Sequence, residues 1–488
     1  MPSSKSHPRS STLSAVPSDP GGGDAPTAAD RGIALTLVLL SASATALVTA
    51  RRFSTANRAG LLALAFAALA LAIFVGRWRR ALRMPMVVAL SAVLLVVGVA
   101  RWPRDSTDLW SYAAYGRMVS HYGASPYRHV PVEYSNDRAI RRVKPTWQNT
   151  SSVYGPVWNG ISAGVVSVTQ TRQLSTRIWF QSLAALSVFL AVLLIARRTR
   201  SPAAVALLGL NPLVIYDVVN GGHNDALVGL ALLVGVLLAS RERFKLAALA
   251  IALGALVKLV ALLGLVALIV WIVRKRGVRP AAIATGIGGG VIAAGYALNG
   301  GFDALTPLRE ARLQMSRNSI WLLSNSEGRT NLFGLGRVQF SHDFLQTATT
   351  LSTIAVIVLA AVLVAGRLRD NTPTMVVGSA LVAYLLAGAY VLPWYAAWAL
   401  PVLVLEWRSG LTRLVLAQSA LYLIAYQYRQ GVPASVPYRA IFASNVALVL
   451  FELTIIVALV VMIVRQRRPG RARVEAAGPP TPVAARLD

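Results

Sequence analysis

Cysteine is absent from the 488-residue chain, and charged residues make up only 14% of it. The absence of cysteine excludes disulfide bonds, thiolate catalysis and zinc–thiolate sites. The scarcity of charge sets the chain apart from soluble domains, in which about a quarter of the residues are charged. Much of the surface of this protein therefore faces something other than water.

Long apolar runs take the place of the missing charge, and 55% of the residues are hydrophobic. Runs of about 17 to 25 residues have the length that a helix needs to cross ~30 Å of hydrocarbon. They lack the two-residue alternation of barrel strands, and a bilayer admits only helices or closed barrels. We therefore predict an all-α, polytopic integral membrane protein.

Basic residues outnumber acidic ones by 48 to 19, which gives a formal charge of +29. In a soluble protein such a charge would suggest nucleic acid. Here the Lys and Arg residues lie mostly in short loops between apolar runs, where they fix the orientation of the spans and contact anionic headgroups. The expected partners are membrane lipids and not nucleic acid.

The apolar runs predict about 12 to 13 crossings plus one re-entrant hairpin. The full spans are expected at 32–50, 59–76, 84–101, 178–196, 202–219, 226–240, 281–298, 345–366, 373–391, 395–406, 411–427 and 440–464. Residues 1–30 and 469–488 are polar or rich in Pro and Ala, so we predict disordered tails around a transmembrane domain at 31–468. No removable signal peptide is evident at the start.

The distribution of Arg and Lys predicts the orientation of the spans. It places both termini in the cytoplasm and two large loops, 102–153 and 299–343, outside the plasma membrane. The run 246–273 has basic residues at both ends, so we predict a re-entrant hairpin with Lys258 near its tip. The run 154–170 is too polar for a secure span, and we expect that it does not cross fully.

The first outer loop contains two carboxylates, Asp105 and Asp108, at a spacing that places them on one face of a helix. Residues 106–122 predict an amphipathic helix in the plane of the interface. Asp108 is also suited to stabilise the N-terminus of that helix. Asp105 is also suited to pair with Arg104 or Arg101.

A second polar group lies at the outer end of a span, in the sequence NGGHND. His223, Asn224 and Asp225 are either functional residues or the cap of the next helix, and the two roles are compatible. A Lys within an apolar segment is costly, so Lys258 predicts a function or a specific partner. It is suited to neutralise a phosphate, to pair with a carboxylate such as Asp225, or to extend towards the interface.

The second outer loop offers three arginines, Arg309, Arg312 and Arg317, with His342 at the start of the next span. Arginine is suited to bidentate phosphate binding, and generic headgroup binding is the alternative. The sequence PWYAAWALP at 393–401 carries aromatic residues that we interpret as an interfacial belt.

These motifs together resemble the GT-C membrane glycosyltransferases. More closely, they resemble the actinobacterial polyprenol-phosphate-mannose-dependent α-(1,6)-mannosyltransferases. The segment DLWSYAAYGRMVSHYGASPY matches that family's pattern D-x-[YW]-S-Y-A-x-x-G…G-x-x-P-Y. Its GGxHND segment appears here as Gly221, Gly222, His223, Asn224 and Asp225, without the residue at x. The resemblance extends from about residue 84 to 430, mainly in layout towards its end.

The resemblance implies transfer of a sugar, mannose or else arabinose, from a polyprenyl phosphate donor to a glycolipid or polysaccharide acceptor at the outer face. Inversion requires a base, for which Asp108 is the candidate and Asp105 the alternative. The candidates for binding the donor phosphate are Lys258, Arg309, Arg312, Arg317 and His342. The candidates for binding the sugar or acceptor are Tyr112, Tyr154, His223, Asn224 and Asp225. We expect no metal and no other cofactor.

The competing hypothesis is a transporter or flippase of a lipid or lipid-linked sugar, because broken helices near the midplane are a transporter feature. However, the chain lacks a clear internal repeat, and its polar residues are concentrated in the outer loops and not within the spans. A structural scaffold would not explain Lys258 or the paired aspartates.

Overall fold

The structure of the protein is a computed structural model. It describes residues 25–311, 313–316, 319–321, 341–370, 372–427, 450, 452–459 and 461. Within these residues every regular element is a helix, which confirms the predicted all-α class. Most of the two predicted tails and most of the predicted span 440–464 lie outside the described residues.

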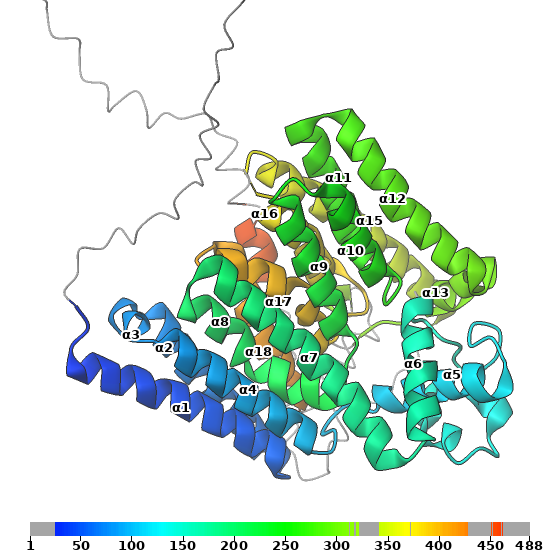
Figure 1. Cartoon of the computed structure of the whole chain (residues 1–488), viewed down its shortest axis with the longest axis horizontal. Coiled ribbons are helices and arrows are strands. Elements are labelled where there is room, and N and C mark those ends of the chain that lie inside the picture. Colours follow the sequence, from blue (N-terminus) through cyan, green and yellow to red (C-terminus); the bar gives the residue numbers. More distant parts are fainter. Residues whose placement is uncertain are drawn as a thin grey trace, which may run out of the picture.

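The elements follow one another from α1 to α18 (Figure 1). The first half contains α1 (Ala28–Ala50), α2 (Thr55–Phe74), α3 (Gly76–Arg80), α4 (Met84–Ala100), α5 (Asp108–Tyr122), α6 (Pro156–Thr169), α7 (Gln173–Thr199), α8 (Pro202–Gly209) and the π-helix η4 (Val214–Val219). The second half contains α9 (Asp225–Ala239), α10 (Phe244–Ala255), α11 (Ala261–Arg276), α12 (Val278–Leu298), α13 (Thr306–Ala311), α15 (His342–Arg367), α16 (Thr374–Ala387), α17 (Ala396–Leu403) and α18 (Gly410–Gln427). The 3-10 turns are η1 (Pro131–Tyr134), η2 (Ile140–Arg142), η3 (Pro145–Trp147), η5 (Gly301–Leu305), η7 (Pro393–Tyr395) and η8 (Val404–Glu406).

Five of the described helices are long and apolar enough to cross a membrane: α1, α2, α7, α12 and α15. Each coincides with a predicted span. Four shorter apolar helices, α4, α9, α10 and α16, accompany them. One large apolar core joins helices from both halves of the chain, and α9 lies near its centre, in contact with α7, α10 and α17 (Figure 1).

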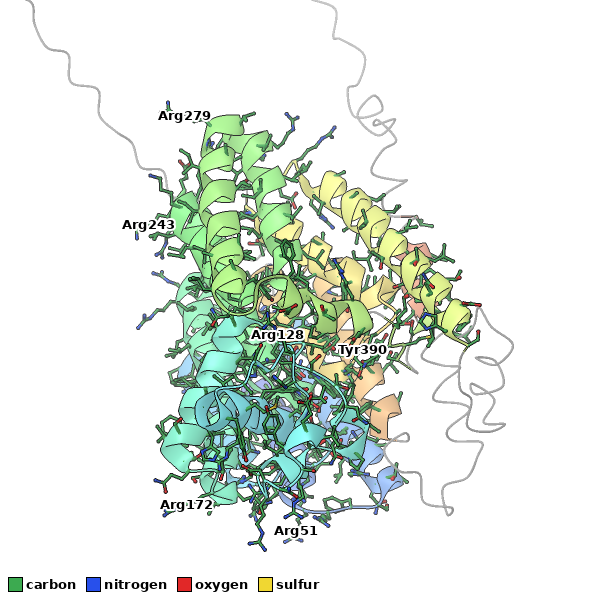
Figure 2. The ribbon with its side chains drawn as sticks, turned by 90° about the vertical axis from the view of Figure 1, so that its right-hand side faces the viewer. Arg51, Arg128, Arg172, Arg243, Arg279 and Tyr390 are labelled. Carbon is green, nitrogen blue, oxygen red and sulfur yellow. The ribbon has the colours of Figure 1, made fainter. Side chains whose placement is uncertain are left out.

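The run predicted as a hairpin forms α10 and α11, with Lys258 in the turn between them; its re-entrant placement in a membrane stays a prediction. The 12 residues of α10 extend about 18 Å, which is less than the ~30 Å of a hydrocarbon core. The two helices pack on each other and on α12. Arg243 before α10 and Arg279 after α11 lie towards the same end of the molecule, whereas Arg51 and Arg172 lie at the opposite end (Figure 2).

The doubtful run at 154–170 forms α6, which has 14 residues and a length of about 21 Å. It packs beside α5, which occupies most of the predicted interfacial segment (Figure 1). At its start, the backbone N–H groups of Gly155 and Val157 donate to the carbonyls of Val257 and Leu256, each at 3.0 Å. The run thus forms a short helix docked on the turn that precedes α11, and the expectation that it does not cross fully stays a prediction.

The predicted continuous span at 202–219 is wrong in one respect, because the structure divides it into α8 and η4. Pro212 cannot donate a backbone hydrogen bond, and the side chain of Asn211 bonds locally to the N–H of Leu213 at 3.0 Å. The π-helix that follows changes the direction in which Asp217 and the residues after it project.

The close approach of α5 and α6 depends on Gly116. A Cβ atom at this position would lie 2.4 Å from the carbonyl oxygen of Ser162, whereas one at Gly160 in α6 would meet nothing within 4 Å. We expect Gly116→Ala to destabilise the protein by about 1–3 kcal/mol, because the backbones of α5 and α6 would have to move apart to make room for the added methyl group. Gly160→Ala is the matched control. Thermal unfolding of the purified protein measures both, and equal stability of the two variants would contradict this account of the contact.

Candidate active site

Asp108 is the first residue of α5, and its backbone N–H donates to Ser106 Oγ at 3.2 Å. Its neighbours Leu109 and Tyr112 are buried, but 25% of the Asp108 side chain remains exposed. The carboxylate therefore stabilises the N-terminus of the helix and is also accessible to a substrate. The two roles predicted for Asp108 are compatible.

Asp105 is held differently, since only 2% of its side chain is exposed. Its oxygens accept from Arg58 Nη1 at 3.1 Å and from Gln427 Nε2 at 2.8 Å. The hydroxyl of Tyr216 donates to the same glutamine at 3.2 Å. Asp105 thus joins α2, α18 and η4, with Arg58 as its ion-pair partner in place of the expected Arg104 or Arg101. This arrangement favours a positioning role over that of the alternative base.

Asn220 connects the segment before α5 to the segment before α9. Its Oδ1 accepts from the backbone N–H of Arg104 at 2.9 Å, and its Nδ2 donates to the carbonyls of Gly98 and Arg101 at 3.0 and 3.1 Å. Gln181 Nε2 donates to the carbonyl of Asn220 at 2.6 Å. These bonds hold the residues around Asp108 next to the NGGHND turn.

His223 lies between two carboxylates. The chain turns at Gly222, whose φ of +69° favours glycine. Nδ1 of His223 is 3.6 Å from Asp108 Oδ2 and 4.0 Å from Asp225 Oδ2. The ring is fully buried and stacks on Trp394, with 4.2 Å between the ring centroids. The structure thus brings together residues that are more than 100 positions apart.

Asp225 and Lys258 form a buried ion pair with a distance of 2.8 Å between Oδ1 and Nζ. Trp398 Nε1 donates to the same oxygen at 2.5 Å. The ammonium group lies 4.3 Å from the ring centroid of Tyr395 and 5.0 Å from that of Trp398, which are favourable cation–π distances. Pairing with Asp225 was one of the alternatives predicted for Lys258, and the structure confirms it.

An aromatic cluster borders the site. Tyr112 contacts Tyr154 edge to face at a centroid distance of 4.9 Å, and Trp158 at 5.1 Å. The predicted pair Tyr112 and Tyr154 thus lies together, and Tyr112 follows Asp108 by about one turn of α5.

Burial determines the ionisation of the central groups. It raises the pKa of Asp108 to about 6; the negative charge of Asp225 adds to this shift, and the positive charge of Lys258 opposes it. Burial also holds the pKa of His223 well below its usual value, and Lys258 acts in the same direction. Near neutral pH the site therefore holds an ionised Asp108 beside a neutral imidazole.

The remaining predicted residues are not joined to this cluster. Arg309 in α13 and His342 at the start of α15 are exposed, and no described contact connects either one to Asp108. Arg312 and Arg317 lie outside the described residues. No group of three or more His, Asp or Glu side chains is arranged to hold a metal ion in the described ranges, and metal independence stays a prediction.

The interpretation of residues 393–401 as an interfacial belt is wrong. Trp394, Tyr395 and Trp398 are at most 8% exposed, and they contact His223 and Lys258. Aromatic spacing alone does not distinguish an interfacial belt from aromatic residues buried inside the protein.

Asp217 was also missed, although an acidic residue within an apolar run is a signal of function.

The family model described as "Alpha-(1->6)-mannopyranosyltransferase, N-terminal domain" matches residues 25–274, just over half of the chain. This range contains Asp108, His223, Asp225 and Lys258. A second model, "Glycosyltransferase family 87", matches residues 165–393.

Curated relatives carry the same description. The chain is 29% identical to alpha-(1->6)-mannopyranosyltransferase A of Mycobacterium tuberculosis over 343 residues, which cover 66% of this chain and 64% of that protein. It is 32% identical to alpha-(1->6)-mannopyranosyltransferase B of Corynebacterium glutamicum over 146 residues, 28% of this chain and 24% of that protein. The matches thus span less than two thirds of the length of these relatives.

The buried ion pair generates a stability prediction. Lys258→Met leaves Asp225 charged without its cation, and we expect a loss of about 3–5 kcal/mol. The double variant Lys258→Met/Asp225→Asn removes both charges and should regain much of that stability, because the two residues interact directly. Unfolding of the single and double variants in detergent measures the coupling. If the effects of the two substitutions on the free energy of unfolding simply added, the interaction between Asp225 and Lys258 would not contribute to stability.

Proposed function

Because the chain belongs to the alpha-(1->6)-mannopyranosyltransferase family, we propose that it transfers a mannosyl group from a polyprenyl phosphate donor to a hydroxyl of a lipid-linked glycan. The family supports the reaction class, and the donor, the acceptor and the mechanism are part of the proposal. The apolar helices suit a donor whose tail lies in the bilayer. We place the active site at the outer face and both termini in the cytoplasm, as the distribution of basic residues predicts.

One observation carries the proposed mechanism: Asp108 is a partly open carboxylate whose pKa of about 6 lies close to neutrality. A general base works best when its pKa is near the working pH, since it is then ionised and still basic. In the proposed step Asp108 accepts the proton of the acceptor hydroxyl. The acceptor oxygen forms a bond to C1 of the sugar while the bond from C1 to the phosphate oxygen breaks, and polyprenyl phosphate leaves with the bonding electrons.

His223 supports Asp108 from the buried side. With Nδ1 at 3.6 Å from Asp108 Oδ2, a small shift allows the imidazole N–H to donate to the carboxylate and fix its orientation. Asp225 and Lys258 continue this row of groups beyond His223. Lys258 is the described candidate nearest to Asp108 for stabilising the leaving phosphate. The candidates Arg309, Arg312, Arg317 and His342 require approach of the second outer loop.

The assignment of Asp108 as the base predicts that Asp108→Asn nearly abolishes transfer while the protein remains folded. The amide cannot accept the proton, so kcat should fall about 10²- to 10⁴-fold. The assay follows mannose from a polyprenyl phosphate donor into a glycan acceptor in detergent or vesicles. Asp303→Asn is the matched control, because Asp303 forms an exposed ion pair with Arg128 and should have little effect. Full turnover by Asp108→Asn would refute the assignment of the base.

The same assignment predicts how kcat/KM depends on pH. Asp108 must be ionised to accept a proton, so kcat/KM should fall about tenfold per pH unit below about pH 6 and level off above it. Burial holds the pKa of His223 well below its usual value, so Asp108 is the group expected to titrate near pH 6. The pH profile of the free enzyme measures this. Activity that persists unchanged to pH 4.5 would mean that another group acts as the base.

A further inference from the structure

Asp217 differs from the other deeply buried aspartates of this protein. The side chains of Asp105 and Asp225 are only 2% and 1% exposed, but each has a cation and an N–H donor within hydrogen-bond distance. Asp217 is 1% exposed, and neither of its oxygens has a hydrogen-bond partner within the described part of the chain. Folding therefore removes the hydrogen bonds that this carboxyl group makes with water and does not replace them with bonds to the described residues.

The backbone around Asp217 is also unusual. It lies in η4, the π-helical segment Val214–Val219, in a stretch predicted as a membrane span. Single π-helical turns frequently occur at functional sites, and an ionisable residue at such a depth is a functional candidate by default. Nothing in the described packing requires a carboxyl group there, since an apolar side chain would avoid the same cost.

The residues that follow Asp217 share its lack of partners. Both polar side-chain atoms of Asn224, both ring nitrogens of His223 and Oδ2 of Asp225 are buried without a hydrogen bond among the described residues. Asp105, Asp108 and Asp225, in this order of strength, are close enough to Asp217 to act on its charge. Asp217, His223, Asn224 and Asp225 thus form a set of buried polar groups along η4 and the start of α9, and the partly open Asp108 lies beside it, 3.6 Å from His223 Nδ1.

The chemistry of this set of buried polar groups selects its ligand. A phosphate requires donors, and carboxylates would repel it. A lipid tail would leave every one of these polar atoms unsatisfied. The set combines acceptors, on Asp217, Asp225 and Asn224 Oδ1, with donors, on Asn224 Nδ2 and the imidazole. Sugar hydroxyl groups both donate and accept, so a polyhydroxylated ring matches this mixture.

We infer that Asp217 is a binding residue for a hydroxyl group of the hexose, and that it extends the sugar subsite inward from His223 and Asn224. The inference rests on the proposed transfer of a sugar. It adds a residue that determines which sugar binds, because a buried acceptor that requires a hydroxyl discriminates strongly against a ring that lacks it.

The test uses the lack of hydrogen-bond partners for Asp217 among the described residues. Asp217→Leu removes an unpartnered carboxyl group, so the melting temperature of the full-length protein should equal or exceed that of the wild type. Asp105→Leu is the matched control: it removes a buried but paired carboxylate and should lower the melting temperature by several degrees. A loss of stability in Asp217→Leu as large as that in Asp105→Leu would overturn the inference, because Asp217 would then be structural.

Ligand response provides the second measurement. The probes are polyprenyl phosphate mannose, polyprenyl phosphate without sugar, and a soluble mannose disaccharide that stands in for the acceptor. In the wild type the sugar-bearing donor should raise the melting temperature more than bare polyprenyl phosphate does. Asp217→Leu should lose this difference, retain the response to bare polyprenyl phosphate, and lose about tenfold or more in kcat/KM.

The probes also identify the source of the sugar. Loss of the response to the disaccharide, with the donor difference intact, would assign Asp217 to the hexose of the acceptor. Retention of both sugar responses by Asp217→Leu would overturn the inference and leave the proposed transfer standing. A wild-type protein that binds neither sugar and transfers none would overturn the proposed function itself.

Discussion

The ion pair between Asp225 and Lys258 is the interaction on which the arrangement of the site depends. The α10–α11 hairpin turns back within the molecule, and its turn contains a cation that cannot remain unpaired in a medium of low dielectric constant. Asp225 at the start of α9 supplies the opposite charge. Because α9 begins at the last residue of the NGGHND turn, the pair that anchors the hairpin also fixes the position of His223 relative to Asp108.

The same turn organises the outer part of the molecule. Residues 256–260 interrupt the helix and leave carbonyl groups that need donors. The first backbone N–H groups of α6 satisfy the carbonyls of Leu256 and Val257, and α6 in turn packs against α5, which carries Asp108. One buried charge pair and two backbone hydrogen bonds thus connect the hairpin, α6, α5 and α9.

Charge distribution and segment length predicted much of this fold from the sequence. Basic residues at both ends of 246–273 required a hairpin, and the polar content of 154–170 excluded a secure span. The carboxylates Asp105 and Asp108 were separated into one paired and one open group only by contacts with Arg58 and Gln427, which are remote in sequence. The wall formed by Trp394, Tyr395 and Trp398 was missed for a related reason, because aromatic residues near a span boundary are equally compatible with lipid and with protein.

The buried aspartates differ in how far protein groups replace the hydrogen bonds with water that are lost on burial. Asp105 and Asp225 each recover part of the cost of burial from a cation and a donor, so they contribute to the geometry of the ligand-free protein. Asp217 and Asn224 recover none within the described residues. A sugar gives up hydrogen bonds between its hydroxyl groups and water when it binds, so the site must offer replacements. If other protein groups already bonded to Asp217 and Asn224, these side chains would have no hydrogen bonds to offer the sugar. A binding site of this kind is therefore necessarily less stable when empty, and the paired aspartates around it supply the rigidity that allows it to persist.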